Sequence, residues 1–84
     1  MASIQLKLFA SLRESVEIED VSVAIKTEDS VDDLLTHLCS EYALFKQYYD
    51  ELPVLVAVNH TMVDMTHTLH DGDEVALFPP VTGG

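Results

Sequence analysis

Apolar residues recur at every second position along three stretches of this chain. In the first of them Ile4, Leu6 and Leu8 share one face, which is the pattern of a half-buried β-strand. Residues 54–58 are instead continuously apolar, which indicates a more central strand covered on at least one face. The pattern therefore predicts β-strands at residues 3–9, 21–26, 54–58 and 74–78, and a short returning strand at residues 62–63.

A helical period replaces this alternation in the middle of the chain. Ser30 is a suitable N-cap, and Asp33 follows at the capping-box spacing, with Asp in place of Glu. The next apolar residues are spaced for one helix face; they are Val31, Leu34, Leu35, Leu38, Cys39 and Tyr42. We expect one continuous helix from residue 31 to residues 48–50, because Pro53 prevents a longer one. Residues 10–15 are expected to form a single helical turn.

These elements predict an α+β fold in which a mixed sheet packs on one main helix, since this arrangement buries the apolar helix face. The short connection between the first two strands favours an antiparallel pair. We expect the first and last strands to pair in the centre of the sheet. Residues 1–78 then form one domain, and residues 79–84 form an extended C-terminal tail that begins at a central strand of the sheet.

Composition narrows the range of partners. The 84 residues suffice for one domain, and 15 Asp and Glu residues face four Lys and Arg residues, which gives a formal net charge of −11. This charge argues against nucleic acid and anionic membrane as partners and favours a basic partner, although a merely solvated acidic surface is compatible with it. The lone Cys39 excludes a disulfide scaffold, and no segment resembles a signal peptide or a membrane span. We therefore expect the protein in the cytoplasm.

Candidate chemistry inside the domain is sparse. The sequence has no nucleophile elbow, phosphate-binding loop or dinucleotide fingerprint. Its histidines lack the convergent spacing of a metal site, so we expect them to be exposed, and we expect no bound metal or cofactor. Cys39 is expected to be buried and unreactive. The remaining aromatic residues of the helix are expected to pack in the core and at the helix edge, with a partner surface as the less favoured alternative; they are Tyr42, Phe45, Tyr48 and Tyr49.

Three large apolar residues are placed differently. Phe9, Met62 and Phe78 lie on strands or turns at the sheet face that the helix is expected to leave uncovered. Together they predict either an exposed apolar patch, which usually marks an interface, or a second small core layer, and the sequence leaves both open. Arg13, close to Phe9 in the sequence, is either an interface anchor or a member of a weak surface ion pair.

The end of the sequence is unusual. Residues 79–82 read Pro-Pro-Val-Thr, and the two prolines stop the last strand because neither has a backbone N–H. Gly83 and Gly84 follow, and their lack of side chains lets an extended tail enter a channel too narrow for other residues. Such a tail would deliver its terminal carboxylate. The alternative is a frayed end without function.

Three segments resemble a known family. Residues 71–84 resemble the C-terminal signature of the small, sulfur-carrying subunits of molybdopterin synthase, above all in the ending Phe-Pro-Pro-Val-Thr-Gly-Gly. Residues 58–61 resemble the Val-Asn segment of that family, and residues 8–14 resemble its opening Phe-Ala-x-x-Arg-Glu. The resemblance spans nearly the whole chain in the same order. It implies a β-grasp, ubiquitin-like fold, which agrees with the predicted order of elements.

The resemblance also implies a chemistry. An E1-like adenylyltransferase uses ATP to adenylate the Gly84 carboxylate, and sulfur then replaces AMP to give a thiocarboxylate. The tail, of which Gly83 is part, enters the large catalytic subunit of a heterotetramer and donates sulfur to cyclic pyranopterin monophosphate. By position in the family pattern, the partner-binding residues are Phe9, Arg13, Met62, Phe78, Pro79, Pro80, Val81 and Thr82.

Other functions remain open at this point. The chain could carry sulfur for thiamine synthesis or tRNA thiolation, although the Phe-Pro-Pro-Val ending argues against the thiamine carrier and the length argues mildly against the tRNA carrier. It could instead modify proteins through isopeptide bonds to lysine, or be a binding module with an inert tail. In the favoured reading the chain is a co-substrate and subunit rather than an enzyme.

Overall fold

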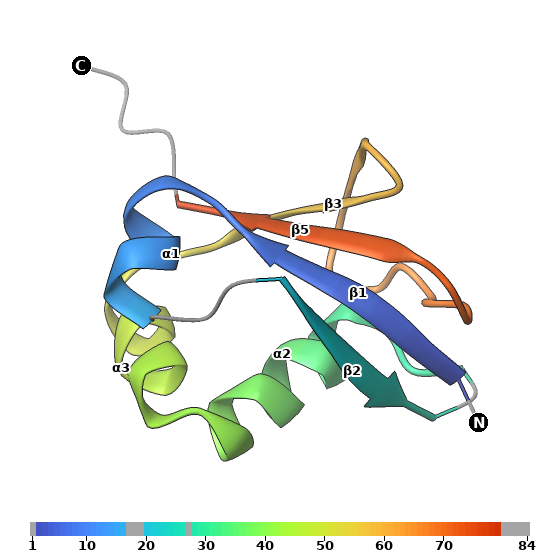
Figure 1. Cartoon of the computed structure of the whole chain (residues 1–84), viewed down its shortest axis with the longest axis horizontal. Coiled ribbons are helices and arrows are strands. Elements are labelled where there is room, and N and C mark those ends of the chain that lie inside the picture. The colour runs from blue at the N-terminus through green and yellow to red at the C-terminus, as the bar shows by residue number, and fades with distance from the viewer. Residues whose placement is uncertain (1, 17–19, 27, 80–84) are drawn as a thin grey trace.

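A computed structural model describes residues 2–16, 20–26 and 28–79 of the chain. Its strands form one mixed sheet in the order β2-β1-β5-β3-β4, in which β1 and β5 are parallel and the other neighbours are antiparallel. The helices α2 and α3 lie on one face of this sheet (Figure 1). The predicted α+β, β-grasp architecture is thereby confirmed. The elements are β1 (Ala2–Leu8), α1 (Ala10–Val16), β2 (Val21–Ile25), α2 (Val31–Glu41), α3 (Ala43–Glu51), β3 (Leu55–Val58), β4 (Thr61–Val63) and β5 (Glu74–Phe78).

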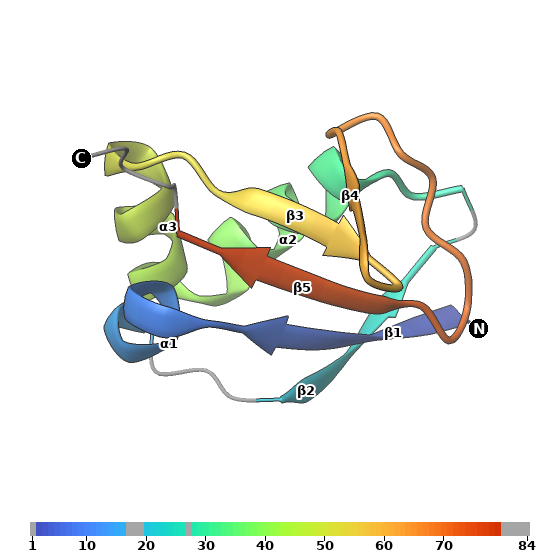
Figure 2. The same cartoon turned by 90° about the horizontal axis from the view of Figure 1, so that it is seen from above.

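The centre of the sheet joins strands from opposite ends of the sequence (Figure 2). Gln5 pairs with Glu74 and Leu8 pairs with Leu77 in the parallel β1–β5 ladder, which confirms the predicted central pair. The expected antiparallel pairing of β1 with β2 is also present, although the connection holds the helix α1 rather than a single turn. Alternate residues of the two central strands are buried against the helices: Ile4, Leu6 and Leu8 of β1, and Val75 and Leu77 of β5.

The prediction of one continuous helix is wrong, because the chain breaks at Tyr42. This residue has extended backbone angles (φ −126°, ψ 107°) and separates α2 from α3. As a result Tyr42 is 37% exposed instead of completing the apolar face, and Cys39 is half-buried rather than buried. The α2 residues that enter the core are Val31, Leu34, Leu35 and Leu38.

The break has a geometric reason. A straight helix over residues 31–49 would be about 28 Å long at 1.5 Å per residue, whereas a five-residue strand such as β5 spans only about 17 Å. After the break, α3 packs against α1 and α2 and turns a second apolar face inward. Phe45 becomes fully buried and Tyr48 nearly so, while Tyr49 stacks on Phe45 with ring centroids 5.8 Å apart.

The predicted capping box is present at the start of α2. The Ser30 side chain accepts a hydrogen bond from the Asp33 backbone N–H (3.2 Å), and the Asp33 carboxylate accepts one from the Ser30 N–H (2.9 Å). These bonds satisfy donors that have no partner inside the helix. The first turn of α2, which carries Val31 and Leu34 into the core, is therefore fixed at its outer end.

We expect Ser30→Ala to lower the free energy of unfolding by about 1 kcal/mol, because it removes an N-cap acceptor. In a domain of this size that loss corresponds to a fall of about 4–8 °C in Tm, measurable by thermal denaturation. Ser40→Ala is the matched control, since Ser40 is exposed on the same helix and alanine favours helix there. Equal Tm values for the two variants would contradict the capping assignment.

None of the helices in the described part of the chain combines the length and the apolar character that crossing a bilayer requires.

Candidate partner-binding face

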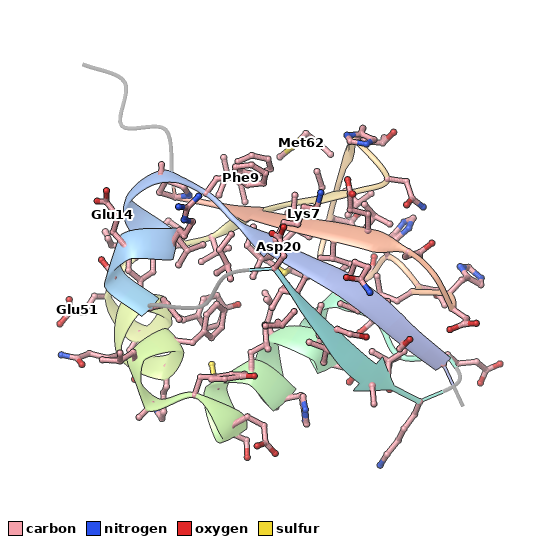
Figure 3. All side chains as sticks on the ribbon, in the orientation of Figure 1. Lys7, Phe9, Glu14, Asp20, Glu51 and Met62 are labelled. Atoms are coloured by element: carbon pink, nitrogen blue, oxygen red, sulfur yellow. The ribbon has the colours of Figure 1, made fainter. Side chains whose placement is uncertain are left out.

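One face of the sheet is not covered by the helices, and we call it the outer face. Its residues are fixed by the strand register, because side chains on directly paired residues point to the same side. Lys7 pairs with Ala76, Ala76 with Ala57, and Ala57 with Met62, so this row crosses β1, β5, β3 and β4. Figure 3 shows Phe9, Lys7 and Met62 on the same side of the sheet, opposite the helices.

Two phenylalanines stack on one another at the end of this face. The Phe9 and Phe78 rings are nearly parallel (10°) with centroids 4.9 Å apart. Phe9 is held in place by its backbone N–H, which donates to the Leu77 carbonyl (3.2 Å). The chain then turns sharply at Ala10, whose φ is +54°, a left-handed conformation that costs a non-glycine residue free energy. The start of α1 and the end of β5 thus hold the two rings together.

The large apolar residues of the outer face remain accessible to solvent. Phe9 is 40% exposed and Met62 is 57% exposed, while Phe78, the other ring of the stack, is half-buried. The alternative of a second core layer is therefore wrong, and the exposed-patch prediction is confirmed. Ala57 and Ala76 separate Met62 from Lys7 in the register, so small side chains form the outer face in the middle of the sheet. We call Phe9, Met62 and Phe78 the aromatic–methionine patch.

A polar cluster lies beside this patch. The Glu74 carboxylate contacts Lys7 through one oxygen (3.1 Å to Nζ) and His60 through the other (3.2 Å to Nε2). The Asn59 side chain donates to Asp73 (2.9 Å) and accepts from the Glu74 N–H (3.0 Å). The turn after β3 is thereby tied to the start of β5, at the opposite end of that strand from Phe78. The outer face is thus apolar near the exit of β5 and charged near its start.

The β3–β4 turn that carries His60 is strained. Val58 pairs directly with Thr61, which leaves a two-residue loop whose residues both have positive φ, +50° at Asn59 and +71° at His60. This is the hairpin geometry in which Asn is common first and Gly second. Histidine in the second position therefore costs free energy that glycine would not.

We expect His60→Gly to raise the free energy of unfolding by about 1 kcal/mol, since it relieves the left-handed backbone. The lost ion pair with Glu74 offsets little of this gain, because the His60 side chain is 86% exposed. Thermal denaturation measures the change. The control is His70→Gly, at an exposed histidine without positive φ; a similar rise in both variants would refute the explanation.

The other predicted site residues are placed as follows. Arg13 is exposed on α1, and its backbone N–H donates to the Phe9 carbonyl (3.3 Å), which ties the helix to the patch. Pro79 follows β5 and is half-buried. Five further residues of the predicted tail lie outside the described residues: Pro80, Val81, Thr82, Gly83 and Gly84.

No second reactive centre stands out in the described residues. Burial raises the pKa of the Cys39 thiol, and the nearby Asp50 carboxylate adds to this effect, so the nucleophilic thiolate is scarce at neutral pH. His37, His60, His67 and His70 are all exposed. Within the described ranges, no group of three or more His, Cys, Asp and Glu side chains is arranged to hold a metal ion.

Sequence reasoning missed the polar cluster of Lys7, His60 and Glu74. Lys7 and Glu74 occupy polar positions of predicted strands, but their proximity depends on the parallel β1–β5 register. The sequence does indicate a turn at Asn59-His60-Thr61, between two apolar runs, but the contact of His60 with Glu74 depends on the β3–β5 register.

Comparison with known proteins identifies related sequences. The sequence profile of the ThiS family matches residues 6–84 of the chain. The molybdopterin synthase sulfur carrier subunit of Escherichia coli (strain K12) is 40% identical over 81 residues, which cover 96% of this chain and 99% of that protein.

Solved structures share the fold. SAMP1 from Haloferax volcanii superposes with a TM-score of 0.82 at 30% identity, covering 99% of this chain and 100% of that one. A chain from the complex of subunits 1 and 2 of the molybdopterin-converting factor of Helicobacter pylori 26695 superposes with a TM-score of 0.70, covering 98% and 99% of the two chains. Its identity of 23% supports the fold alone.

Proposed function

This chain belongs to the ThiS family, and from that premise we propose that it is the sulfur carrier subunit of a molybdopterin synthase. The proposal is supported by the relative in Escherichia coli that carries this name, with 40% identity over nearly the full length of both chains. We place its action in the cytoplasm, where an unpaired cysteine such as Cys39 stays reduced.

The single structural observation that carries the proposal is the exposed Phe9–Phe78 stack at the end of β5. Phe78 is the last residue of that strand and directly precedes the segment ending in Gly83 and Gly84. A partner that binds the aromatic–methionine patch would therefore lie close to the point where the C-terminal segment begins. Aromatic residues and methionine are enriched at the centres of interfaces, and methionine adapts to more than one partner.

The proposed chemistry takes place at the Gly84 carboxylate and begins with activation. A carboxylate oxygen attacks the α-phosphorus of ATP on an E1-like adenylyltransferase, which forms an acyl-adenylate and releases pyrophosphate. A sulfur atom at the oxidation level of hydrosulfide then attacks the acyl carbon, and AMP leaves with the electron pair of the broken C–O bond. The product is a thiocarboxylate on Gly84. ATP is a substrate of the activating enzyme, and we propose no cofactor bound to this chain.

The chain that carries the thiocarboxylate then binds the large subunit. We propose that residues 79–84 enter the active site of that subunit, where the thiocarboxylate is shielded from bulk water until it reacts. Its sulfur forms a C–S bond to a carbon of cyclic pyranopterin monophosphate, from which an oxygen leaving group departs. Water then hydrolyses the resulting thioester, so that the sulfur stays on the pterin and Gly84 is released as a carboxylate. Two chains that carry a thiocarboxylate supply the two sulfur atoms of the dithiolene. This number of carriers fits a heterotetramer with two small subunits. The patch residues, with Arg13 and the Pro-Pro-Val-Thr segment, bind the partner, and the acidic body with its net charge of −11 steers it toward basic clefts.

Reconstitution tests the proposal. The purified chain is incubated with ATP, an E1-like adenylyltransferase of molybdopterin synthesis and sodium sulfide, and its intact mass is measured. We expect a gain equal to the exchange of one oxygen for one sulfur, followed by loss of that sulfur when the large subunit and cyclic pyranopterin monophosphate are added. An unchanged mass, or a charged chain that the large subunit cannot discharge, would refute the proposal.

A protein modifier is the second candidate function, because SAMP1 from Haloferax volcanii, whose name denotes a small archaeal modifier protein, is 30% identical over nearly the whole chain. This function predicts covalent conjugates in which Gly84 is joined to lysine side chains. The same incubation, repeated with a cell extract and analysed on a denaturing gel, distinguishes the two functions. A carrier for thiamine or tRNA thiolation would be charged in the same way but would fail at the large subunit.

A further inference from the structure

A groove runs along the edge of the sheet that lies farthest from β4. It has a volume of about 440 Å³ and lies between β2 and α2. Its lining includes Ala24 and Ile25 from the strand, Leu34 and His37 from the helix, and the carboxylates of Asp29 and Asp33. Figure 1 shows β2 at this edge with α2 beneath it. The groove is thus bounded on one side by a strand that has only one neighbour.

The hydrogen-bond pattern of β1 determines which backbone groups of β2 are free. The Ser3 carbonyl accepts from the Gly72 N–H (2.8 Å), and the Gln5 N–H donates to the Asp73 carbonyl (2.8 Å). These two residues therefore direct their backbone groups away from β2. Their antiparallel partners are Ala24 and Ser22, which in such a pair direct their own N–H and C=O groups toward the free edge.

Among the described residues, the free edge is closed at the end near Lys26. The N–H of Lys26, the next outward-facing residue, donates to the Asp29 carboxylate (2.8 Å). Ser22 and Ala24 are exposed and present two donors and two acceptors at the spacing of a β-ladder. Natural proteins usually protect such edges with proline, bulges or very short strands. The opposite edge strand, β4, has only three residues, whereas β2 has five regular ones.

The charge around the groove indicates what would bind there. Asp29 and Asp33 line it, and Glu28 and Asp32 are exposed next to them in sequence. Lys26 is the cation in the lining, and its backbone is already tied to Asp29. The side of the groove formed by the start of α2 is therefore acidic, while its floor, with Ile25 and Leu34, is apolar.

We propose that this groove binds an extended segment of a partner protein, in which apolar residues are flanked by Lys or Arg. The segment adds a sixth strand to the sheet beside β2, with its main chain bonded to Ser22 and Ala24 and alternate apolar side chains on the floor. Its basic residues lie against Asp29 and Asp33. Recognition at this groove is a separate function from sulfur transfer, because the groove is at a different edge and on the helix side of the sheet.

A second copy of the chain is the less favoured occupant. Pairing two β2 edges would bring together two bodies that each carry a net charge of −11, and like charges oppose such association. A basic segment has the opposite charge and is attracted over the same distance. Charge complementarity therefore favours a heterologous partner.

Titration with a defined peptide tests the proposal. The probe is the capped synthetic peptide Lys-Arg-Val-Ile-Val-Val-Lys-Arg, added to the ¹⁵N-labelled chain and followed by NMR. We expect the largest amide shifts at Ser22, Ala24 and the first turns of α2, and an affinity that falls as NaCl is raised. A peptide with Glu in place of every Lys and Arg should not bind. Shifts centred on the aromatic–methionine patch, or equal binding of both peptides, would overturn the proposal.

Two variants of the chain make the test sharper. Ala24→Pro removes a donor at the free edge without removing a ladder bond, so we expect about tenfold weaker binding, whereas Ala24→Ser should bind normally. Thr36→Lys places a positive charge in the groove lining from an exposed helix position, and we expect several-fold weaker binding. Its control, Ser40→Lys, is on the same helix outside that lining.

The outcomes separate cleanly. Unchanged binding by Ala24→Pro and by Thr36→Lys would refute the proposal. If one of the two variants misfolds, unchanged binding by the other refutes it. Formation of a dimer by the unliganded chain, abolished by Ala24→Pro in sedimentation velocity, would assign the edge to self-association and also refute it. Charging of the chain with sulfur should be unaffected in every variant, so the result is independent of the proposed function.

Discussion

Adding one alanine after Gly84 is expected to abolish sulfur charging while leaving the Tm of the domain unchanged. The extension moves the reactive carboxylate one residue beyond the position that the activating site accepts and puts a methyl group where the last residue would have none. Intact mass after incubation with ATP, the adenylyltransferase and sulfide measures charging. We expect no detectable thiocarboxylate, and thermal denaturation should give the same transition for both proteins.

The control for this experiment is an alanine added before Met1, at the other end of the chain, which should leave charging intact. Deleting Gly84 should have the same effect as extending it, since the carboxylate is then one residue short. Normal charging of the extended chain would mean that the terminal group is not the reactive one, and every carrier function would then fail.

Replacing Phe9 by alanine is expected to weaken binding to the large subunit by about tenfold to a hundredfold, which is typical of a central aromatic residue of an interface. The loss of the Phe9–Phe78 stack should lower the free energy of unfolding by only about 1 kcal/mol, because Phe9 is 40% exposed. Isothermal titration calorimetry with the large subunit gives the affinity, and thermal denaturation gives the stability.

Leu44→Ala provides the comparison for that variant. Leu44 is 42% exposed but lies on α3, away from the outer face, so its removal exposes a similar area without touching the patch. We expect its affinity for the large subunit to be unchanged. A large loss of Tm in Phe9→Ala with full affinity would show that the ring is structural instead.

Much of the fold could be predicted because each strand has a local signature. The alternation of Ile4, Leu6 and Leu8 describes a strand with one buried face, and these three side chains are buried in the structure. The capping box at Ser30 and Asp33 is equally local, and both of its hydrogen bonds are present. Such a pattern depends on only a few neighbouring residues, so it favours the same local structure in the unfolded chain as in the folded one.

The break at Tyr42 could not be predicted from the helical period. The apolar spacing continues through Cys39 and Tyr42 and gives no local sign of a stop, such as glycine or proline. After the break, α3 packs against α1 and α2 and buries Phe45 completely. These are properties of the assembled core, and tertiary packing overrides a weak local preference.

The candidate site was predictable in part for the same reason. Phe9, Met62 and Phe78 could be identified as apolar residues on the uncovered face, because their strands and the helix were recognisable. The Phe9–Phe78 contact and the place of Glu74 between Lys7 and His60 depend on which strands become neighbours. The central pairing of the first and last strands could be predicted, but the register of that pair and the place of β3 beside β5 depend on long-range contacts that local patterns do not specify.

The parallel pairing of β1 with β5 has a consequence for how the protein matures in the cell. Gln5 and Glu74 are paired although nearly the whole sequence separates them, and closing such a long loop is entropically costly and slow. A nascent chain cannot complete its central strands until residue 78 has emerged from the ribosome. Phe9 directly follows β1 and Phe78 ends β5, so the Phe9–Phe78 stack forms only after translation has passed that point. On the proposed function, an incomplete chain would therefore present no assembled patch to a partner.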